Sequence, residues 1–331
     1  MIHLVTRADC DHTVRRFLSA AGRGLRGVRP LHYETLLRRR RAPLGHYIFT
    51  DYDRLTGADV DAVIALADAL QARHPDVRLL NHPRRVLERV PLLCRLEALG
   101  LNDFGAVRLD TGARPRRYPV FIRSEDGCGG PETGLIHDQA GFDDALRDLE
   151  RRGMTLKRRI AVGFCAEPDE QGRYRKYGAM NIGGRIIPQH IHCSTDWNVK
   201  WGQTRYQTAL ADEELDYLRD NPHRDELLEI FRVAGIDYGR IDYGFAHGRL
   251  QTYEINTNPA LPRFTGRQGL RAGRRDLIRP AMIDALQALD HPLLPRGTVR
   301  FRWADDGAPS LSALRRSILY RRLRRLYHRW L

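Results

Sequence analysis

Three polar residues late in the chain have types and spacing that suit a metal site. Asp242 precedes the turn sequence Ala-His-Gly at 246–248, and Glu254 follows it, with Asn256 two residues farther on. Alternating residue types on both sides of the turn predict two paired strands, and residues two apart in a strand point to the same face. Asp242 can therefore lie beside Glu254 and Asn256. Two carboxylates and an amide oxygen are hard oxygen ligands that suit Mg²⁺ or Mn²⁺, which share their remaining positions with water and phosphate oxygens.

Strict alternation along the second strand assigns its other side chains as well. It places Leu250 and Thr252 on the face of Glu254, and Tyr253 on the opposite face. The alternative to a metal site is an ordinary hairpin with exposed acids. The sequence Glu-Ile-Asn-Thr-Asn-Pro at 254–259 favours a site, because it has turn residues and amides where a plain strand would have apolar side chains.

A glycine-rich segment in the first half of the chain could bind phosphate. The sequence Tyr-Pro-Val-Phe-Ile-Arg-Ser at 118–124 predicts a strand, and the segment Glu-Asp-Gly-Cys-Gly-Gly-Pro at 125–131 follows it directly. Glycines let backbone N–H groups approach phosphate oxygens closely, so Gly127, Gly129 and Gly130 are candidate ligand-binding residues. The segment is not a Walker A loop, because no Gly-Lys-Ser/Thr follows the glycines. A wide glycine turn without a ligand is the alternative.

Lysine is rare in this chain, and two of its lysines are candidates for ligand contact. Of the 55 Lys+Arg residues, which face 41 Asp+Glu, only three are lysine. The net charge of +14 would fit nucleic acid, a membrane surface or an acidic ligand, but the strong preference for arginine indicates that part of it is compositional. A lysine is favoured where a compact, movable ammonium group is needed. Lys176 lies in a predicted hairpin strand, where Arg175 is the alternative, and Lys200 lies in the polar, aromatic-flanked loop at 194–201.

The histidine and cysteine patterns argue against a zinc site or a disulfide framework. His190 and His192 are two apart on a predicted strand and could supply half of a metal site, but no third His or Cys stands at a fitting spacing. A structural role for this pair is the favoured interpretation. The five cysteines are odd in number, widely spaced and without a Cys-x-x-Cys pair, which indicates reduced thiols.

The ordered set of these motifs resembles the ATP-grasp superfamily, in the style of the D-alanine–D-alanine ligases. The strongest matches are the sequence Arg-Ile-Asp-Tyr-Gly at 240–244 together with 254–259, and the strand with its glycine-rich segment at 118–131. The resemblance runs from about residue 81 to residue 289. It implies ATP and Mg²⁺ (or Mn²⁺) as cofactors.

The resemblance also implies roles for single residues. Asp242, Glu254 and Asn256 would hold the metal ion. Arg240 would lie by the γ-phosphate or the acyl phosphate and, with Lys176, would act in catalysis. The residues implied to contact ATP, including the phosphate-binding glycines and the hinge that holds adenine through its backbone, are Arg123, Gly127, Gly129, Gly130, Gly163, Phe164, Lys176, Lys200 and Asn258.

The reaction implied by the resemblance is carboxylate–amine ligation. Such a ligase phosphorylates a carboxylate with ATP, and an amine then attacks the acyl phosphate. The expected partners are therefore a small-molecule or peptide carboxylate and an amine acceptor. The alternatives are an ATP-dependent phosphotransferase and a non-enzymatic nucleotide- or nucleic-acid-binding protein. We do not expect nucleic acid as a partner, because the aromatic residues do not interleave with basic residues as a stacking platform requires.

Several α/β units must position these residues. The expected fold class is α/β with α+β lobes: an ATP-grasp fold with an N-terminal Rossmann-like pre-ATP lobe and two lobes that clamp ATP. The Rossmann-like lobe is indicated by a strand, a capped amphipathic helix from about Thr56, and a further strand within 47–80. The expected divisions are the pre-ATP lobe, the linker helix with the first ATP-grasp lobe, the second ATP-grasp lobe, and a C-terminal helix, at 1–80, 81–166, 167–300 and 301–331. In the linker helix a lysine common in the family is absent, and Arg89 or Arg95 stands nearest as a substitute.

The C-terminal stretch has a composition of its own. Residues 310–331 contain seven arginines, no acid, and apolar residues at helical spacing, which predicts a basic amphipathic helix. This helix could dock on the body of the protein, on an anionic membrane surface, or on a partner protein or RNA. The chain has no apolar run of about 18–20 residues and no evident signal peptide, so we expect a cytoplasmic protein. The sequence does not indicate an oligomeric state.

Overall fold

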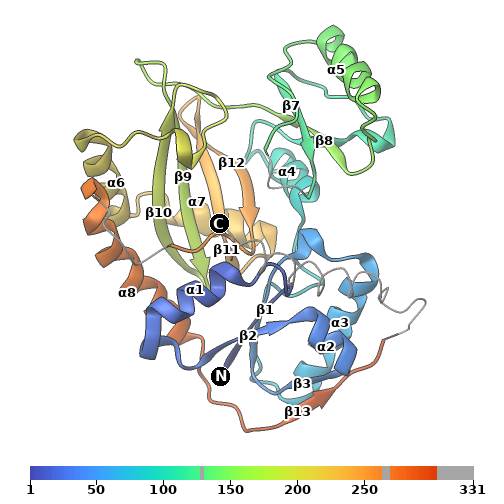
Figure 1. Ribbon diagram of the computed structural model, residues 1–331, viewed down its shortest axis with the longest axis vertical. Helices are drawn as coiled ribbons and strands as arrows, with labels where there is room; N and C mark the ends of the chain where they lie inside the picture. Colours follow the sequence, from blue (N-terminus) through green and yellow to red (C-terminus); the bar gives the residue numbers. More distant parts are fainter. Residues whose placement is uncertain (127–129, 263–268, 304–331) are drawn as a thin grey trace, which may run out of the picture.

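The computed structural model describes residues 1–126, 130–262 and 269–303. Within these residues, three lobes are built on separate sheets: a four-stranded sheet at the N-terminus, then a three-stranded and a second four-stranded sheet. Figure 1 shows the N-terminal lobe at the bottom and the two later sheets above it, on opposite sides. Helices accompany each sheet, so the mixed α/β fold class expected from the sequence is confirmed. The predicted basic helix at 310–331 lies outside the described residues.

The N-terminal lobe is a parallel sheet flanked by helices. Its strands, in the spatial order β2-β1-β4-β5, are β1 (Ile2–Thr6), β2 (Val28–His32), β4 (His46–Phe49) and β5 (Leu79–Leu80). Its helices are α1 (His12–Ala21), α2 (Tyr33–Arg39) and α3 (Gly57–Arg73). The predicted cap of α3 is present: Asp59 N donates a hydrogen bond to Thr56 Oγ1 (3.2 Å), and Thr56 N donates one to the Asp59 carboxylate (3.0 Å).

The middle lobe, which we call the small lobe, is antiparallel. Its strands, in the order β6-β8-β7, are β6 (Ala106–Arg108), β7 (Val120–Ser124) and β8 (Arg159–Gly163), and its helix is α5 (Gln139–Arg151). Phe142 and Leu149 of α5 are buried against Val120 and Ile122, so one apolar stripe of the helix covers one face of the sheet. Helix α4 (Arg89–Ala98) precedes this lobe and contacts the lobe that follows.

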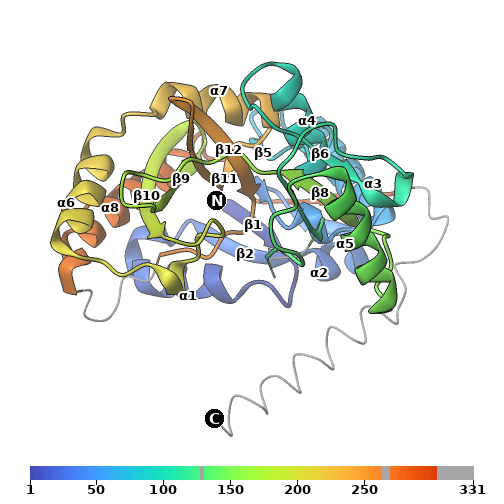
Figure 2. The ribbon, with the colours of Figure 1, turned by 90° about the horizontal axis from the view of Figure 1, so that it is seen from above.

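The third lobe, which we call the large lobe, contains both predicted hairpins. Its strands, in the order β10-β9-β11-β12, are β9 (Tyr174–Ile182), β10 (Arg185–Ser194), β11 (Tyr238–Ala246) and β12 (Arg249–Asn256). Its helices are α6 (Thr208–Asp220), α7 (Arg224–Ala234) and α8 (Ala272–Ala288). The turn of the second hairpin has positive φ at His247 (53°) and Gly248 (69°), as a tight two-residue hairpin turn requires. In Figure 2 the large sheet and the small lobe lie on opposite sides of the view from above.

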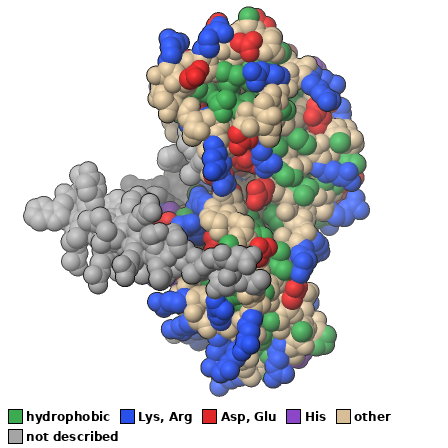
Figure 3. Space-filling view, turned by 90° about the vertical axis from the view of Figure 1, so that its right-hand side faces the viewer, with side chains coloured by type: hydrophobic (Ala, Val, Ile, Leu, Met, Phe, Trp, Pro, Cys, Tyr) green, Lys and Arg blue, Asp and Glu red, His purple; other side chains and the backbone are tan. Residues whose placement is uncertain are grey.

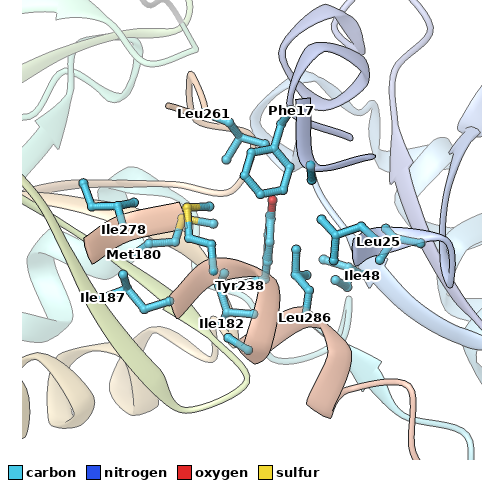
Figure 4. Packing of buried hydrophobic residues seen from close by; sticks show 14 of the residues in the cluster. Phe17, Leu25, Ile48, Met180, Ile182, Ile187, Tyr238, Leu261, Ile278 and Leu286 are labelled. Atoms are coloured by element: carbon cyan, nitrogen blue, oxygen red, sulfur yellow. The ribbon is translucent and has the colours of Figure 1, made fainter. Parts of the chain in front are cut away.

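A shared apolar cluster fixes the large lobe against the N-terminal lobe. Figure 4 shows Phe17 and Ile48 of the N-terminal lobe meeting Tyr238 of β11 and Leu286 of α8. Beside this cluster, Asn81 satisfies backbone groups on both sides: its Nδ2 donates to the carbonyls of Phe49 (2.8 Å) and Tyr238 (2.7 Å). Because a buried amide is costly to leave unpaired, this contact sets how the two lobes meet.

The chain returns to the N-terminal lobe after α8. Strand β13 (Thr298–Arg300) pairs antiparallel with β3 (Arg41–Pro43), and Val299 and Phe301 are buried in the core of that lobe. The expected division counted residues up to 300 with the second ATP-grasp lobe, whereas the structure places residues 298–301 here. Short 3₁₀ turns lie at Gly22–Leu25, Tyr52–Arg54, Leu109–Thr111, Trp201–Gln203 and Gly269–Arg271. Among the described residues, no helix is both long enough and apolar enough to cross a membrane.

Charged side chains are mixed on the surface that Figure 3 presents. On this face, Lys and Arg side chains cover both the upper and the lower part of the molecule, with Asp and Glu side chains among them. The net charge of +14 therefore does not gather there into a single basic stripe. A continuous basic stripe is the surface that a nucleic-acid groove would show.

Candidate active site

A cavity of about 1310 Å³ lies where the three lobes meet. Its walls come from the N-terminal lobe, the start of α4, the small lobe and the sheet of the large lobe. Residues of the first lobe and of the loop at 194–201 take part in the lining. The sequence motifs that are far apart in the chain therefore meet around one space.

Strands β11 and β12 bring the predicted metal ligands together. Asp242 is the direct cross-strand partner of Glu254, and Arg240 is the partner of Asn256. Directly opposed residues of an antiparallel pair share a face, with Cβ atoms about 5 Å apart. The predicted pairing of the two strands is thus present, and both acids line the cavity.

Strict alternation along β12 is wrong at one point. After Asp242↔Glu254 the register shifts to Tyr243↔Thr252, so Tyr253 is the extra residue of a β-bulge. Tyr253 and Glu254 both line the cavity, whereas Leu250 packs in the core cluster that contains Tyr243. Period-two counting cannot reveal a bulge, because the inserted residue carries no sequence mark of its own.

Asp242 lies between two cationic side chains. Its Oδ1 accepts a hydrogen bond from Arg240 Nε (2.9 Å), and its Oδ2 lies 3.6 Å from Lys176 Nζ. Burial of the carboxyl favours its neutral form, but the charges of Arg240 and Lys176 outweigh burial and hold the pKa of Asp242 below its ordinary value. Asp242 is therefore a carboxylate at neutral pH. Arg175, the alternative to Lys176 in the predicted hairpin strand, forms ion pairs with Asp169 and Glu213 instead.

Glu254 also contacts two cations. Its Oε2 accepts a hydrogen bond from Arg89 Nη2 (2.7 Å) and lies 3.5 Å from Arg123 Nη1. Arg89 therefore stands in the cavity, while Arg95, the other candidate for the missing lysine, is exposed on α4. The sequence named both arginines as substitutes for the missing lysine, and only the packing of the lobes brings Arg89 to Glu254.

The two asparagines that follow Glu254 differ in their contacts. Asn256 Oδ1 accepts a hydrogen bond from Asn258 N (2.9 Å), which orients its amide oxygen at the strand end. Asn258 Nδ2 donates to both carboxylate oxygens of Asp51 (2.9 and 3.1 Å) and to the Cys10 carbonyl (3.2 Å). The side chain of Asn258 thus connects the strand end to the N-terminal lobe. Asn258 also lines the cavity, and its contact with the nucleotide stays a prediction.

The expected adenine-binding residues lie at one wall of the cavity. The N–H groups of Gly163 and Phe164 already donate to the carbonyls of Gly105 (3.0 Å) and Pro119 (2.9 Å). Cys165, the next residue to Phe164, also lines the cavity, and no hydrogen bond among the described residues uses its backbone N–H. The wall is aromatic as well, because Trp197 packs 5.2 Å from Phe121 and 5.5 Å from Phe164, measured between ring centroids. Such a surface suits a planar base.

The glycine-rich segment is described only in part. Gly127 and Gly129 lie outside the described residues. Gly130 has a φ of 91°, which favours glycine, and it lines the cavity. A Cβ at Gly130 would lie 3.1 Å from Lys200 Nζ, so the ammonium of Lys200 lies directly against this end of the segment. The structure therefore brings Lys200 and Gly130 together.

The two histidines of β10 are stacked and buried. Their ring centroids are 4.0 Å apart, and the ring of His190 lies over Gly178, where a Cβ would leave it no room. Burial, with the nearby charge of Lys176, lowers the pKa of His192 to about 3, and burial lowers the pKa of His190 as well. Both rings are neutral near pH 7. Among the described residues, no group of three His, Cys, Asp or Glu side chains is placed to hold a metal ion. The predicted Mg²⁺ site has two carboxylates and an amide oxygen instead.

The Asp242–Glu254 pair fits such an ion chemically. Both side chains are carboxylates on one sheet face, and the oriented amide oxygen of Asn256 stands at the adjacent cross-strand position. All three donors are oxygens, which is the ligand type that Mg²⁺ requires. The four cations around the two acids exceed them in charge, so the site as a whole attracts anions such as phosphates.

Comparison with known proteins finds similarity in overall structure. No protein-family model and no curated protein sequence matches the chain. Among solved structures, the chain is similar to a D-alanine–D-alanine ligase from Bacillus anthracis (12% identity, 87% of this chain and 96% of that chain, TM-score 0.48). It is also similar to the ATP-grasp ligase PsnB complexed with a phosphomimetic precursor variant, Mg and ADP (14%, 87% and 96%, 0.48). A third similar structure is the VanG D-Ala:D-Ser ligase from Enterococcus faecalis (12%, 87% and 98%, 0.48).

Proposed function

We propose that this protein is an Mg²⁺/ATP-dependent ligase that activates a carboxylate as an acyl phosphate for attack by an amine. The observation that carries the proposal is the Asp242–Glu254 cross-strand pair, which four cationic side chains surround in a cavity between three lobes. The motif resemblance in the sequence points to the same chemistry. The main physical task of such a reaction is to manage negative charge, because ATP and a carboxylate repel each other.

Each side chain has a definite part in that task. Asp242, Glu254 and Asn256 would hold Mg²⁺, which when bound neutralises phosphate charge and polarises the transferring phosphoryl group. Arg240 and Lys176 lie against Asp242, and their charges would stabilise the phosphoryl group during transfer.

The remaining cations would bind the phosphates of ATP. Arg89 and Arg123 now share Glu254, and a polyphosphate offers them a second, more highly charged set of acceptors. Lys200 and Gly130 stand together at another part of the cavity wall, where they would add a cation and a backbone N–H group.

Nucleotide binding is the first test. Mg²⁺ and ATP should raise the thermal unfolding midpoint, because a ligand at a hundredfold of its Kd stabilises the folded state by about 2.7 kcal/mol. Glu254→Ala should abolish the shift. The matched control is Glu229→Ala, which removes a half-exposed glutamate of α7 and should leave the shift unchanged. An absent shift in the unreplaced protein would contradict the proposal.

The reaction class needs a second measurement. A screen of acid and amine pairs should show ATP-dependent phosphate release that requires both partners, together with a condensed product. ADP formation with a phosphorylated product and no condensation would instead identify the protein as an ATP-dependent phosphotransferase, the alternative function of the same site.

A further inference from the structure

The cavity has a second end, beside the start of α8, that the proposed ligase chemistry does not use. Its lining residues are Gln189, His190, His192, Tyr206, Arg271 and Arg274. In the sequence, both arginines belong to a stretch rich in Gly and Arg at 263–275. In the structure, Arg271 ends the last 3₁₀ turn and Arg274 lies in the first turn of α8.

Arg271 forms a two-point ion pair with a buried carboxylate. Its Nε and Nη2 donate to Glu214 Oε2 (2.8 Å) and Oε1 (2.5 Å), and its guanidinium lies 3.9 Å from the ring centroid of Tyr206. Glu214 is 1% exposed and also accepts a hydrogen bond from Ile191 N (3.0 Å). This two-point pair holds the segment before α8 in place and neutralises one charge.

Arg274 has no equivalent partner. Its Nε donates to the Gln189 carbonyl (2.7 Å), and the nearest carboxylate oxygen, on Glu214, is 4.0 Å from that same nitrogen. No hydrogen bond among the described residues uses Nη1 or Nη2, and the side chain lines the cavity. Burial, with the charge of Arg271, lowers the pKa of Arg274 to about 10. Arg274 therefore remains charged while its surroundings disfavour that charge, and an anion would relieve the imbalance.

The neighbouring histidines are neutral and do not balance the charge of Arg274. His190 and His192 are neutral near pH 7, and the charges of Arg240, Arg274 and Lys176 contribute to the lowered pKa of His190. His190 Nε2 is buried with no hydrogen-bond partner among the described residues. The α8 end thus has a cationic excess and a second polar group without a partner.

We propose that this end of the cavity binds a second carboxylate of the acid substrate, which is therefore a dicarboxylate. Arg274 offers one planar edge with two nitrogens, and that edge matches the two oxygens of a carboxylate. Arg240 and Arg274 line the same cavity, so one substrate can contact both. The inference rests on the proposed function, since one carboxylate lies at Arg240 for activation while the other is held at Arg274.

Calorimetry with matched acids tests the inference. Succinate, glutarate and adipate are titrated into the full chain saturated with Mg-ADP, and butyrate, valerate and hexanoate serve as monocarboxylates of equal length. At least one dicarboxylate should bind about tenfold or more tightly than its monocarboxylate, as a charge-assisted pair provides. Arg274→Gln should remove this preference, and Arg274→Lys, which keeps the charge but loses the fork, should keep part of it.

The control and the contrary outcomes separate the two proposals. Arg275→Gln removes a neighbouring arginine that is 40% exposed, and it should keep the full preference. Equal binding of both acid series while Mg-ATP still stabilises the protein would overturn the dicarboxylate inference and leave the ligase proposal intact. A preference that survives in Arg274→Gln would overturn the role of Arg274. If that variant does not fold, Arg274→Lys decides, since an undiminished preference there contradicts recognition by the fork.

Discussion

The two ends of the cavity hold their charges in different ways. At the hairpin end, Asp242 and Glu254 each contact two cationic side chains, so every carboxylate has more than one partner. At the α8 end, Glu214 is committed to Arg271, and the outer nitrogens of Arg274 have no hydrogen bond among the described residues. One end has acids that each contact two cations, and the other has two arginines beside a single acid.

The difference indicates what each end can bind. Shared acids can accept a metal ion while their cations turn to phosphates, because both charges gain a new partner. The outer nitrogens of Arg274, whose nearest acid is already paired with Arg271, gain a partner from an anion that arrives with a substrate. The two ends therefore differ in how many oppositely charged partners each charged group contacts, more than in how many charged residues they have.

The largest effect should come from breaking the fixed pair of the α8 end. Glu214→Gln leaves Arg271 facing a neutral amide in a buried place, and loss of one partner of a buried ion pair costs about 3–5 kcal/mol. Urea unfolding should show this loss. Asp216→Asn, on an exposed part of the same helix, is the matched control and should change stability by less than about 0.5 kcal/mol. A near-neutral Glu214→Gln would mean that the α8 end is not fixed by this pair.

An intermediate effect, on nucleotide affinity, should follow from replacing a cation of the hairpin end. Arg89→Gln should weaken Mg-ATP binding about tenfold, or ~1.4 kcal/mol, because a phosphate contact is lost. Equilibrium titration with Mg-ATP measures it, and Arg95→Gln, an exposed change on the same helix, should have no effect. Unchanged or tighter binding in Arg89→Gln would show that Arg89 serves only to neutralise Glu254.

The smallest effect should be a pH dependence that differs between the ends. His192 has a folded pKa of about 3 against an ordinary 6.5, so below pH 6.5 the unfolded chain binds a proton that the folded protein does not. The neutral His192 therefore lowers the free energy of unfolding only as the pH falls below its ordinary pKa. Between pH 6.5 and 5.5 this loss is about 1 kcal/mol. Asp242, whose pKa is held below 3.8, contributes stability that is lost only as the pH falls through that lower value.

Unfolding midpoints at pH 6.5 and 5.5 check this difference. His192→Gln should reduce the decrease seen over that interval, since the replacement has no proton to gain. Asp242→Asn should leave the decrease unchanged, because Asp242 does not titrate in that range. An equal decrease in the unreplaced protein and in His192→Gln would contradict a neutral, buried His192.

The sequence by itself determined the local elements and the residue types of the hairpin end. Turn glycines, a capping box and alternating strands predicted both hairpins and helix α3, because these depend on neighbours in the chain. The short turn also predicts that the two strands pair. Its register alone would oppose Asp242 to Tyr253, and the bulge at Tyr253 places Glu254 opposite Asp242 instead.

Only the tertiary structure decided which side chains meet across the cavity. The bulge at Tyr253, the contact of Arg89 with Glu254 and the use of Asn258 to reach Asp51 depend on packing between lobes. The sequence assigned Arg274 to no site, and only the packing of α8 against β10 places it beside Glu214, which Arg271 already contacts. The local residue pattern determines a helix or a strand. Ion pairs across the cavity join residues that are distant in the chain, so they depend on how the lobes pack.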